Sequence, residues 1–150
     1  MTGEFAIAGA SLWVAAALLL QGLLALAVLV YLGTVRLPMI ARGEVRVHQI
    51  ALDRGGWPER ERRVSNAFDN QFQLPVLLYL GGILAILFGA TWFEALLACL
   101  FVASRFVHAY IHVTDNHVIR RFIAFCAGLA ILVLLWLDLL VRLILAATGN

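Results

Sequence analysis

The sequence predicts an all-α integral membrane protein, a single domain of residues 1–150 built as a four-transmembrane-helix bundle. Hydrophobic residues make up 63% of the chain and charged residues 13%, about half the charged share of a typical soluble domain. Four apolar segments each approach or exceed the roughly 20 residues that cross a bilayer as a helix. We expect helices at about 7–35, 61–88, 93–114 and 117–145, with a cytoplasmic loop at 36–60.

The first apolar segment runs from Phe5 to Val35 without a charged residue. A cleaved signal peptide would begin with basic residues and carry an apolar run of about 7–15 residues. Here Glu4 is the only charge before a much longer run, so we expect this helix to be retained. Gln21, with Gly22 beside it, is expected to face another helix, because amides and small residues are typical of helix contacts in membranes.

Arginines are concentrated in two of the connections between the predicted helices. Seven arginines lie between residues 36 and 63, and Arg120 and Arg121 open the fourth helix. By the positive-inside rule, both connections lie in the cytoplasm and both termini on the non-cytoplasmic side. These arginines are interpreted as topology signals, so no nucleic acid is expected as a partner. A basic set without lysine favours a bacterial inner membrane. Within the loop, a short helix is expected at about 45–52.

A stripe of polar side chains opens the second helix. Its members are Arg62, Asn66, Asp69, Asn70 and Gln73. On a helical wheel they fall on one side of the helix. Since an unpaired polar group in hydrocarbon costs several kcal/mol, the stripe must face protein, water or a ligand. Pro75 removes a main-chain hydrogen bond to the Gln71 carbonyl and predicts a kink beside the stripe.

The third helix carries a second polar stripe, within roughly 80° on the wheel. Its members are Arg105, His108, His112 and Asn116. An arginine inside a membrane almost always faces the bundle interior and has a partner. Asp69 lies at a comparable depth from the same boundary, so we predict an ion pair between Asp69 and Arg105.

Two interpretations of the facing stripes are open. In the first, they form an internal polar network that fixes how the helices align. In the second, they line a cytoplasm-facing pocket that holds an anionic polar ligand against Arg62, Arg105 and either Arg120 or Arg121. A metal or haem site is not expected, because the two histidines of the second stripe lack the carboxylates or facing histidines that such sites use.

Two smaller groupings have structural interpretations. On the fourth helix, Asp138 and Arg142 are four residues apart with the acid first, which favours an intrahelical ion pair. Cys99 and Cys126 lie in predicted spans without the spacing of a metal site. We expect both cysteines to act as small apolar residues, with no disulfide.

The polar stripes resemble the signatures of a known family. Arg62-x-x-x-Asn66-x-x-Asp69-Asn70 resembles the Arg-x-x-x-Asn-x-x-Glu-Asn signature of the second helix of the MAPEG superfamily (membrane-associated proteins in eicosanoid and glutathione metabolism). Ala103-Ser104-Arg105-Phe106-Val107-His108 resembles that superfamily's third-helix signature. The resemblance covers nearly the whole chain and is nearest to a prokaryotic branch.

The resemblance implies a homotrimer that binds glutathione as a co-substrate in a cytoplasm-facing groove between subunits. The ligand-binding residues it suggests are Arg36, Arg62, Asn66, Asp69, Asn70, Arg105 and His108. The candidates for stabilising the glutathione thiolate are Arg120, Arg121 and His112. Asp69 stands where the family usually has Glu, and His112 where its enzymes have Tyr.

The activity that the resemblance implies is a glutathione transferase or peroxidase acting on hydrophobic electrophiles that arrive through the lipid. The alternative is a non-catalytic membrane subunit, or a lipid-binding scaffold of a larger membrane complex, in which the stripes serve assembly. The expected partners are membrane lipid, further copies of the chain, a hydrophobic small molecule and, in the alternative, other membrane subunits.

Overall fold

The protein is described here by a computed structural model covering residues 9–50 and 54–149, and its regular elements are helices. The α-helices are α1 (Ala10–Ala41), α2 (Val47–Ile50), α3 (Glu59–Asp69), α4 (Leu74–Leu87), α5 (Trp92–Val113) and α6 (Val118–Thr148). Two 3₁₀ helices, η1 (Arg54–Gly56) and η2 (Asn70–Phe72), complete the set. In the described part of the chain, four helical segments are long and apolar enough to cross a membrane: α1, α3 with α4, α5, and α6. The predicted fold class is confirmed.

The helix bounds differ from the predicted ones mainly at the two ends of the arginine-rich connection. α1 continues beyond residue 35 and through Pro38 to Ala41, whereas its predicted start at residues 7–8 lies outside the described residues. Of the loop helix predicted at 45–52, the structure has Val47–Ile50 as α2. Residues 51 and 52 again lie outside the described ranges.

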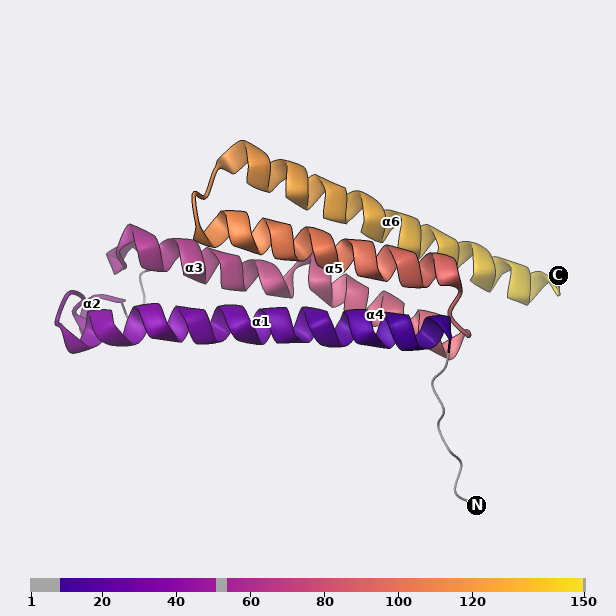
Figure 1. Cartoon of the computed structure of the whole chain (residues 1–150), viewed down its shortest axis with the longest axis horizontal. Helices are drawn as coiled ribbons and strands as arrows, with labels where there is room; N and C mark the ends of the chain where they lie inside the picture. The colour runs from indigo at the N-terminus through magenta and orange to yellow at the C-terminus, as the bar shows by residue number, and fades with distance from the viewer. Residues whose placement is uncertain (1–8, 51–53, 150) are drawn as a thin grey trace, which may run out of the picture.

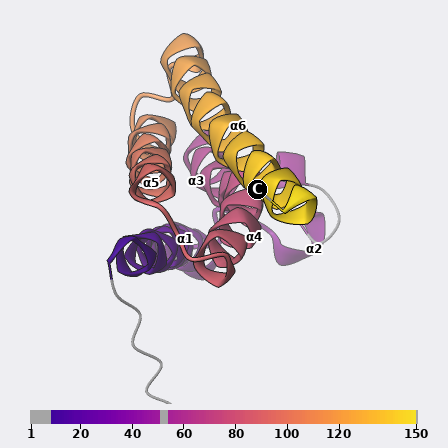
Figure 2. The ribbon, with the colours of Figure 1, turned by 90° about the vertical axis from the view of Figure 1, so that its right-hand side faces the viewer.

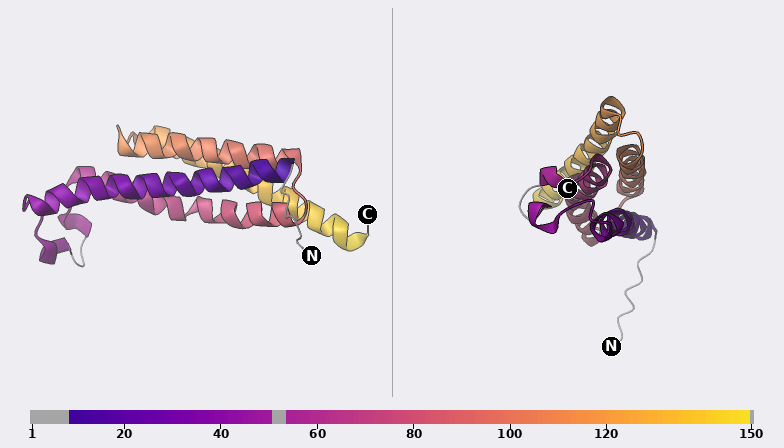
Figure 3. Two further views of the ribbon diagram at one scale, coloured as in Figure 1. Left: turned by 60° about the horizontal axis from the view of Figure 1, so that its bottom comes forward. Right: turned by 90° about the vertical axis from the view of Figure 1, so that its left-hand side faces the viewer.

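The four spans run up and down, so that α1 begins and α6 ends at the same end of the bundle, together with the α4–α5 turn (Figure 1). We call this the terminal end. The opposite end, the connection end, carries α2 and the α5–α6 connection (Figure 1). α5 packs against both α1 and α6, and α4 packs against α1 and α6. Viewed from the terminal end, α6 crosses the other helices at an angle (Figure 2), and the left view of Figure 3 shows its C-terminal part leaving the other helices there.

The apolar core lies along the contacts of the four spans. Its largest cluster includes Ala17 from α1, Leu78 from α4, Phe101 from α5 and Leu135 from α6. Large hydrophobic side chains are also exposed on every span, as expected for helices whose outer faces contact lipid tails rather than water. Burial in this protein is therefore decided by helix contacts more than by polarity.

Small residues bring the helices close together. A Cβ added to Gly82 of α4 would lie 2.7 Å from the Leu18 side chain of α1, and one added to Gly128 of α6 would lie 2.8 Å from Ser104 Oγ of α5. Close approach at small residues is a common way for membrane helices to gain van der Waals contact. These two glycines fix how α4 meets α1 and how α6 meets α5.

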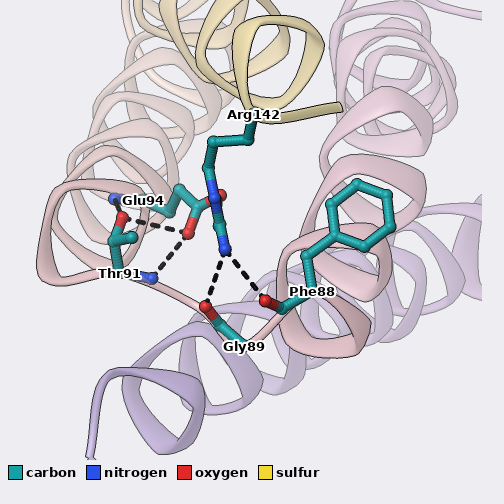
Figure 4. Close-up of polar contacts among 5 residues, drawn as sticks. All are labelled: Phe88, Gly89, Thr91, Glu94 and Arg142. Carbon is teal, nitrogen blue, oxygen red and sulfur yellow. Dashed lines mark hydrogen bonds and ion pairs between the residues drawn. The ribbon is translucent and has the colours of Figure 1, made fainter. Parts of the chain in front are cut away.

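A polar clasp of Thr91, Glu94 and Arg142 closes the terminal end (Figure 4). Arg142 Nη1 donates to Glu94 Oε1 at 2.6 Å, and its Nη2 donates to the carbonyls of Phe88 and Gly89 at 2.9 and 3.0 Å. Glu94 Oε2 accepts from the main-chain N–H and the hydroxyl of Thr91 at 2.6 and 3.0 Å. The Thr91 hydroxyl in turn caps α5 by accepting from the N–H of Glu94.

The clasp overturns the ion pair predicted within the fourth helix. Arg142 pairs with Glu94 on α5 rather than with Asp138 one turn away on its own helix. The Glu94 side chain is fully buried, and a fully buried carboxylate is costly unless a cation pairs with it. The pair thus ties α6 to the α4–α5 turn.

Candidate functional site

The second span is interrupted where its polar stripe is densest. α3 ends at Asp69, η2 follows, and Gln73 has φ −99° and ψ −105°, outside the helical region. α4 then begins at Leu74 with Pro75 in its first turn. Pro75 has no N–H to donate, and the interruption leaves main-chain carbonyls without helical donors. The kink predicted at Pro75 is confirmed, and it is a full break rather than a bend.

Side chains from α1 and α5 meet the interrupted segment. Gln21 of α1 is fully buried and donates through Nε2 to Gln71 Oε1 at 3.0 Å, so the prediction that Gln21 faces another helix is confirmed. Gln71 Nε2 donates in turn to the carbonyl of Ala67 at 3.1 Å. These bonds anchor the break from the side of α1.

Arg105 approaches the same break from α5 and is fully buried. Its Nη2 donates to the main-chain carbonyl of Asn70 at 3.0 Å. The predicted ion pair with Asp69 is wrong, because the guanidinium meets a carbonyl exposed by the helix break instead of the neighbouring carboxylate. Arg105 Nε and Nη1 are buried and have no hydrogen-bond partner within the described residues.

His108 and His112 lie on the same face of α5 as Arg105, each 2% exposed, with ring centroids 5.6 Å apart. His112 Nε2 lies 3.3 Å from Nη1 of Arg121 and 3.5 Å from Nδ2 of Asn70. The same Nη1 of Arg121 donates to Asn116 Oδ1 at 2.6 Å. Residues from η2, α5, the α5–α6 connection and the start of α6 therefore form one polar cluster: Asn70, Arg105, His108, His112, Asn116 and Arg121.

A cavity of about 190 Å³ opens at the edge of the polar cluster. Three members of the cluster line it, Asn70, His108 and Arg121, and the rest of its wall is apolar. The apolar residues come from the first two turns of α6 and are Val118, Phe122 and Phe125. The cavity thus joins hydrogen-bonding groups to a hydrophobic wall on the outer face of the bundle.

The polar cluster has an excess of positive charge. Neither Arg105 nor Arg121 has a carboxylate among its hydrogen-bond or ion-pair partners in the described part of the chain. Other arginines do have one: Arg36 pairs with Glu61, Arg63 with Glu59, Arg120 with Asp115 and Arg142 with Glu94. Arg121 lines the cavity, and Arg105 is fully buried against Asn70, which also lines it. Two such positive charges would attract an anion to the cavity, and strongly so where little water screens them.

The remaining sequence-predicted site residues lie around this cluster rather than in it. Arg36 donates to Glu61 at 2.7 Å and to Ser65 at 3.3 Å, and it lies over the Trp57 ring. Arg120 is exposed and pairs with Asp115 at 3.2 Å. On α3, Arg62 and Asn66 are exposed and Asp69 is half-buried.

Two parts of the site were not predicted from the two polar stripes of the sequence. The apolar wall from α6 was missed because Val118, Phe122 and Phe125 look like any other lipid-facing residues. Glu61, 1% exposed and bonded to Arg36, was missed because it lies in the charge-rich start of the second helix, among residues that look solvent-exposed. The buried histidines lack further metal ligands: among the described residues no three of His, Cys, Asp or Glu gather as a metal site would require.

Comparison with known proteins decides the family. The model of the MAPEG family matches residues 13–141, which is most of the chain. The chain belongs to the MAPEG family. No curated protein and no solved structure matches it. The resemblance inferred from the two polar stripes is confirmed, and membership of a family of membrane four-helix bundles agrees with the four spans.

Proposed function

We propose that this MAPEG protein binds glutathione in the polar cluster and uses its thiol against hydrophobic electrophiles, as a transferase or peroxidase. The family includes glutathione-using enzymes of both kinds. The observation that carries the proposal is the pairing of two guanidinium groups, Arg105 and Arg121, that have no carboxylate partner in the described residues, with a half-polar, half-apolar cavity.

The chemistry of glutathione suits this cluster. Glutathione has two carboxylates, one ammonium and one thiol, so it needs several arginines and one acid. Arg62 and Asn66 are exposed on the neighbouring turns of α3 and are available for a carboxylate. Asp69, half-buried at the end of α3, is the acid that we assign to the ammonium. Arg105 is fully buried and does not line the cavity, so it would contribute its positive charge without touching the ligand.

The thiol would lie near Arg121. A cation beside the sulfur favours the thiolate, which is the reactive nucleophile, over the thiol. Arg120 is less suited, because its charge is already compensated by Asp115. In the transferase reaction, the thiolate forms a C–S bond with the electrophile and a leaving group such as chloride departs with the bonding electrons. The apolar wall of Val118, Phe122 and Phe125 would hold the lipid-soluble partner.

The size of the cavity supports assembly as a homotrimer. Its volume of about 190 Å³ is below the roughly 300 Å³ at which small-molecule sites begin. A neighbouring copy of the chain packed against α6 would enclose a larger site. We assign the connection end to the cytoplasmic side, because the arginine-rich connections lie there and glutathione is a cytoplasmic thiol.

The test is calorimetric titration of the purified protein with millimolar glutathione, followed by turnover of a chlorinated aromatic acceptor. Replacing Arg105 by Met keeps the size of the side chain and removes the charge. We expect Arg105→Met to weaken glutathione binding about ten- to a hundredfold, the range expected when a charge-assisted interaction is lost.

Arg42→Gln is the matched control. This substitution also removes one arginine from the connection end, but Arg42 is exposed and contacts Glu44 rather than the cluster. The affinity of the Arg42→Gln variant for glutathione should therefore equal that of the wild type. Absence of binding by the wild-type protein would end the proposal. An unrelated membrane protein that co-purifies at fixed stoichiometry would then favour the non-catalytic subunit.

A further inference from the structure

Arg121 is held by two groups through a single nitrogen atom. Its Nη1 donates to Asn116 Oδ1 at 2.6 Å and lies 3.3 Å from His112 Nε2. Its Nε and Nη2 have no hydrogen bond to another described residue, and the side chain lines the cavity. One edge of the guanidinium is therefore fixed by the protein, while the rest of its donors remain available to a ligand.

Asn116 is itself rigidly placed. It has φ +51°, in the left-handed region that few residues other than Gly, Asn and Asp adopt readily. Its main-chain N–H donates to the carbonyl of Ile111 at 2.8 Å, which fixes the end of α5. The left-handed turn directs the amide oxygen to Arg121 five residues later, at the start of α6.

The hydrogen bonds around His112 determine which of its ring nitrogens carries the proton. Arginine can only donate, so Nε2 of His112 must accept from Arg121. The amide atom of Asn70 that lies near Nε2 is its nitrogen, Nδ2. The same atom lies 2.7 Å from the carbonyl oxygen of Asn66, where only a donor nitrogen fits. With two donors at Nε2, we infer a neutral ring that carries its proton on Nδ1, which is buried and has no hydrogen-bond partner among the described residues.

We propose that Asn116 and His112 are positioning residues for Arg121, and that they turn its free N–H groups into the cavity where the glutathione sulfur would lie. The inference rests on the proposed function, since it assigns Arg121 to the thiolate. A neutral His112 can accept from Arg121 but does not take up the thiol proton, which leaves to solvent. The role of His112 is therefore to orient the cation rather than to act as a base.

Asn116→Gly tests this inference without straining the backbone. Glycine adopts positive φ at no steric cost, so the turn is kept and only the amide acceptor is lost. The measurement is the pH midpoint at which bound glutathione becomes thiolate, followed by ultraviolet difference absorbance on the full-length protein in detergent. We expect the midpoint to rise by about one pH unit, with the dissociation constant for glutathione changed less than about threefold.

Asp115→Asn is the control. Asp115 precedes Asn116 in the same connection and bonds to Arg120 and to the N–H of His117, but not to Arg121. The pH midpoint for thiolate formation in Asp115→Asn should therefore equal that of the wild type. An unchanged midpoint in Asn116→Gly would overturn the inference while leaving glutathione binding intact. A loss of binding larger than tenfold would also overturn it, because Asn116 would then serve binding rather than the thiolate. Absence of thiolate in the wild-type protein would instead refute the proposed function.

Discussion

The two ends of the bundle use buried arginine in opposite ways. At the terminal end, Arg142 has a carboxylate and two carbonyls as acceptors, and both oxygens of the buried Glu94 are bonded (Figure 4). At the connection end, Arg105 is more deeply buried, yet it makes a single hydrogen bond to a carbonyl and leaves Nε and Nη1 without a partner in the described residues.

The difference separates a group that holds the fold from a group that is available for binding. Removing one member of a satisfied buried pair leaves the other charge uncompensated and destabilises the protein strongly. An unsatisfied buried cation contributes little to stability, because its desolvation is poorly offset, and its unused donors favour a role in ligand binding. The comparison predicts that stability depends on the terminal end and glutathione binding on the connection end.

The largest effect is expected from breaking the clasp. Arg142→Ala leaves the carboxylate of Glu94 buried without a cation, and we expect the free energy of unfolding to fall by about 3 kcal/mol. This is the low end of the range for buried pairs, because the Arg142 side chain is 25% exposed. The measurement is chemical unfolding in detergent micelles.

A double-mutant cycle checks the cause. Adding Glu94→Gln to Arg142→Ala removes the uncompensated charge, so the double variant should lose clearly less stability than the sum of the two single variants. Strict additivity would mean that the ion pair is not what joins α6 to the α4–α5 turn.

A middle-sized effect is expected between the two ends, at the buried amide pair. Gln21→Leu removes the donor to Gln71 Oε1, and an unsatisfied buried acceptor costs about 1–3 kcal/mol. We expect a fall of about 1 kcal/mol in the free energy of unfolding, because Gln21 Oε1 already lacks a partner in the described chain and its loss offsets part of the cost. A glutathione affinity equal to that of the wild type would show that this contact belongs to the fold.

A smaller effect on stability is expected at Arg105, which is more deeply buried than Arg142. Arg105→Met frees the Asn70 carbonyl but also removes a poorly compensated charge, and the two changes oppose each other. We expect the free energy of unfolding to change by less than about 1 kcal/mol while glutathione binding weakens about ten- to a hundredfold. A fall as large as that of Arg142→Ala would show that Arg105 holds the fold, and the contrast between the ends would fail.

The fold was predictable from the sequence because the membrane leaves few alternatives. A chain with 63% hydrophobic residues and four long apolar segments must satisfy its main-chain groups within helices. Helix bounds were less predictable: α1 runs through Pro38, because a proline near the end of a helix removes a single hydrogen bond. The break in the second span was predictable, because Pro75 cannot donate a main-chain hydrogen bond and lies just after a dense polar stripe.

The members of the candidate site were predictable, but their partners were not. Periodicity placed Arg105, His108 and His112 on one face of α5, and burial agrees. It could not show that a helix break would offer Arg105 a carbonyl in place of Asp69. The choice between Arg120 and Arg121 was not predictable either, because a step of about 100° between adjacent helix residues separates the exposed ion pair of Arg120 from the cavity lined by Arg121.

The smallest effect is expected at that exposed ion pair. Arg120 and Asp115 are 68% and 48% exposed, and exposed ion pairs contribute about 0–1 kcal/mol because water and salt screen them. Arg120→Gln should therefore change the free energy of unfolding in micelles by less than about 0.5 kcal/mol, and less still at high salt. A loss near that of Arg142→Ala would mean that the start of α6 is clasped as firmly as its end.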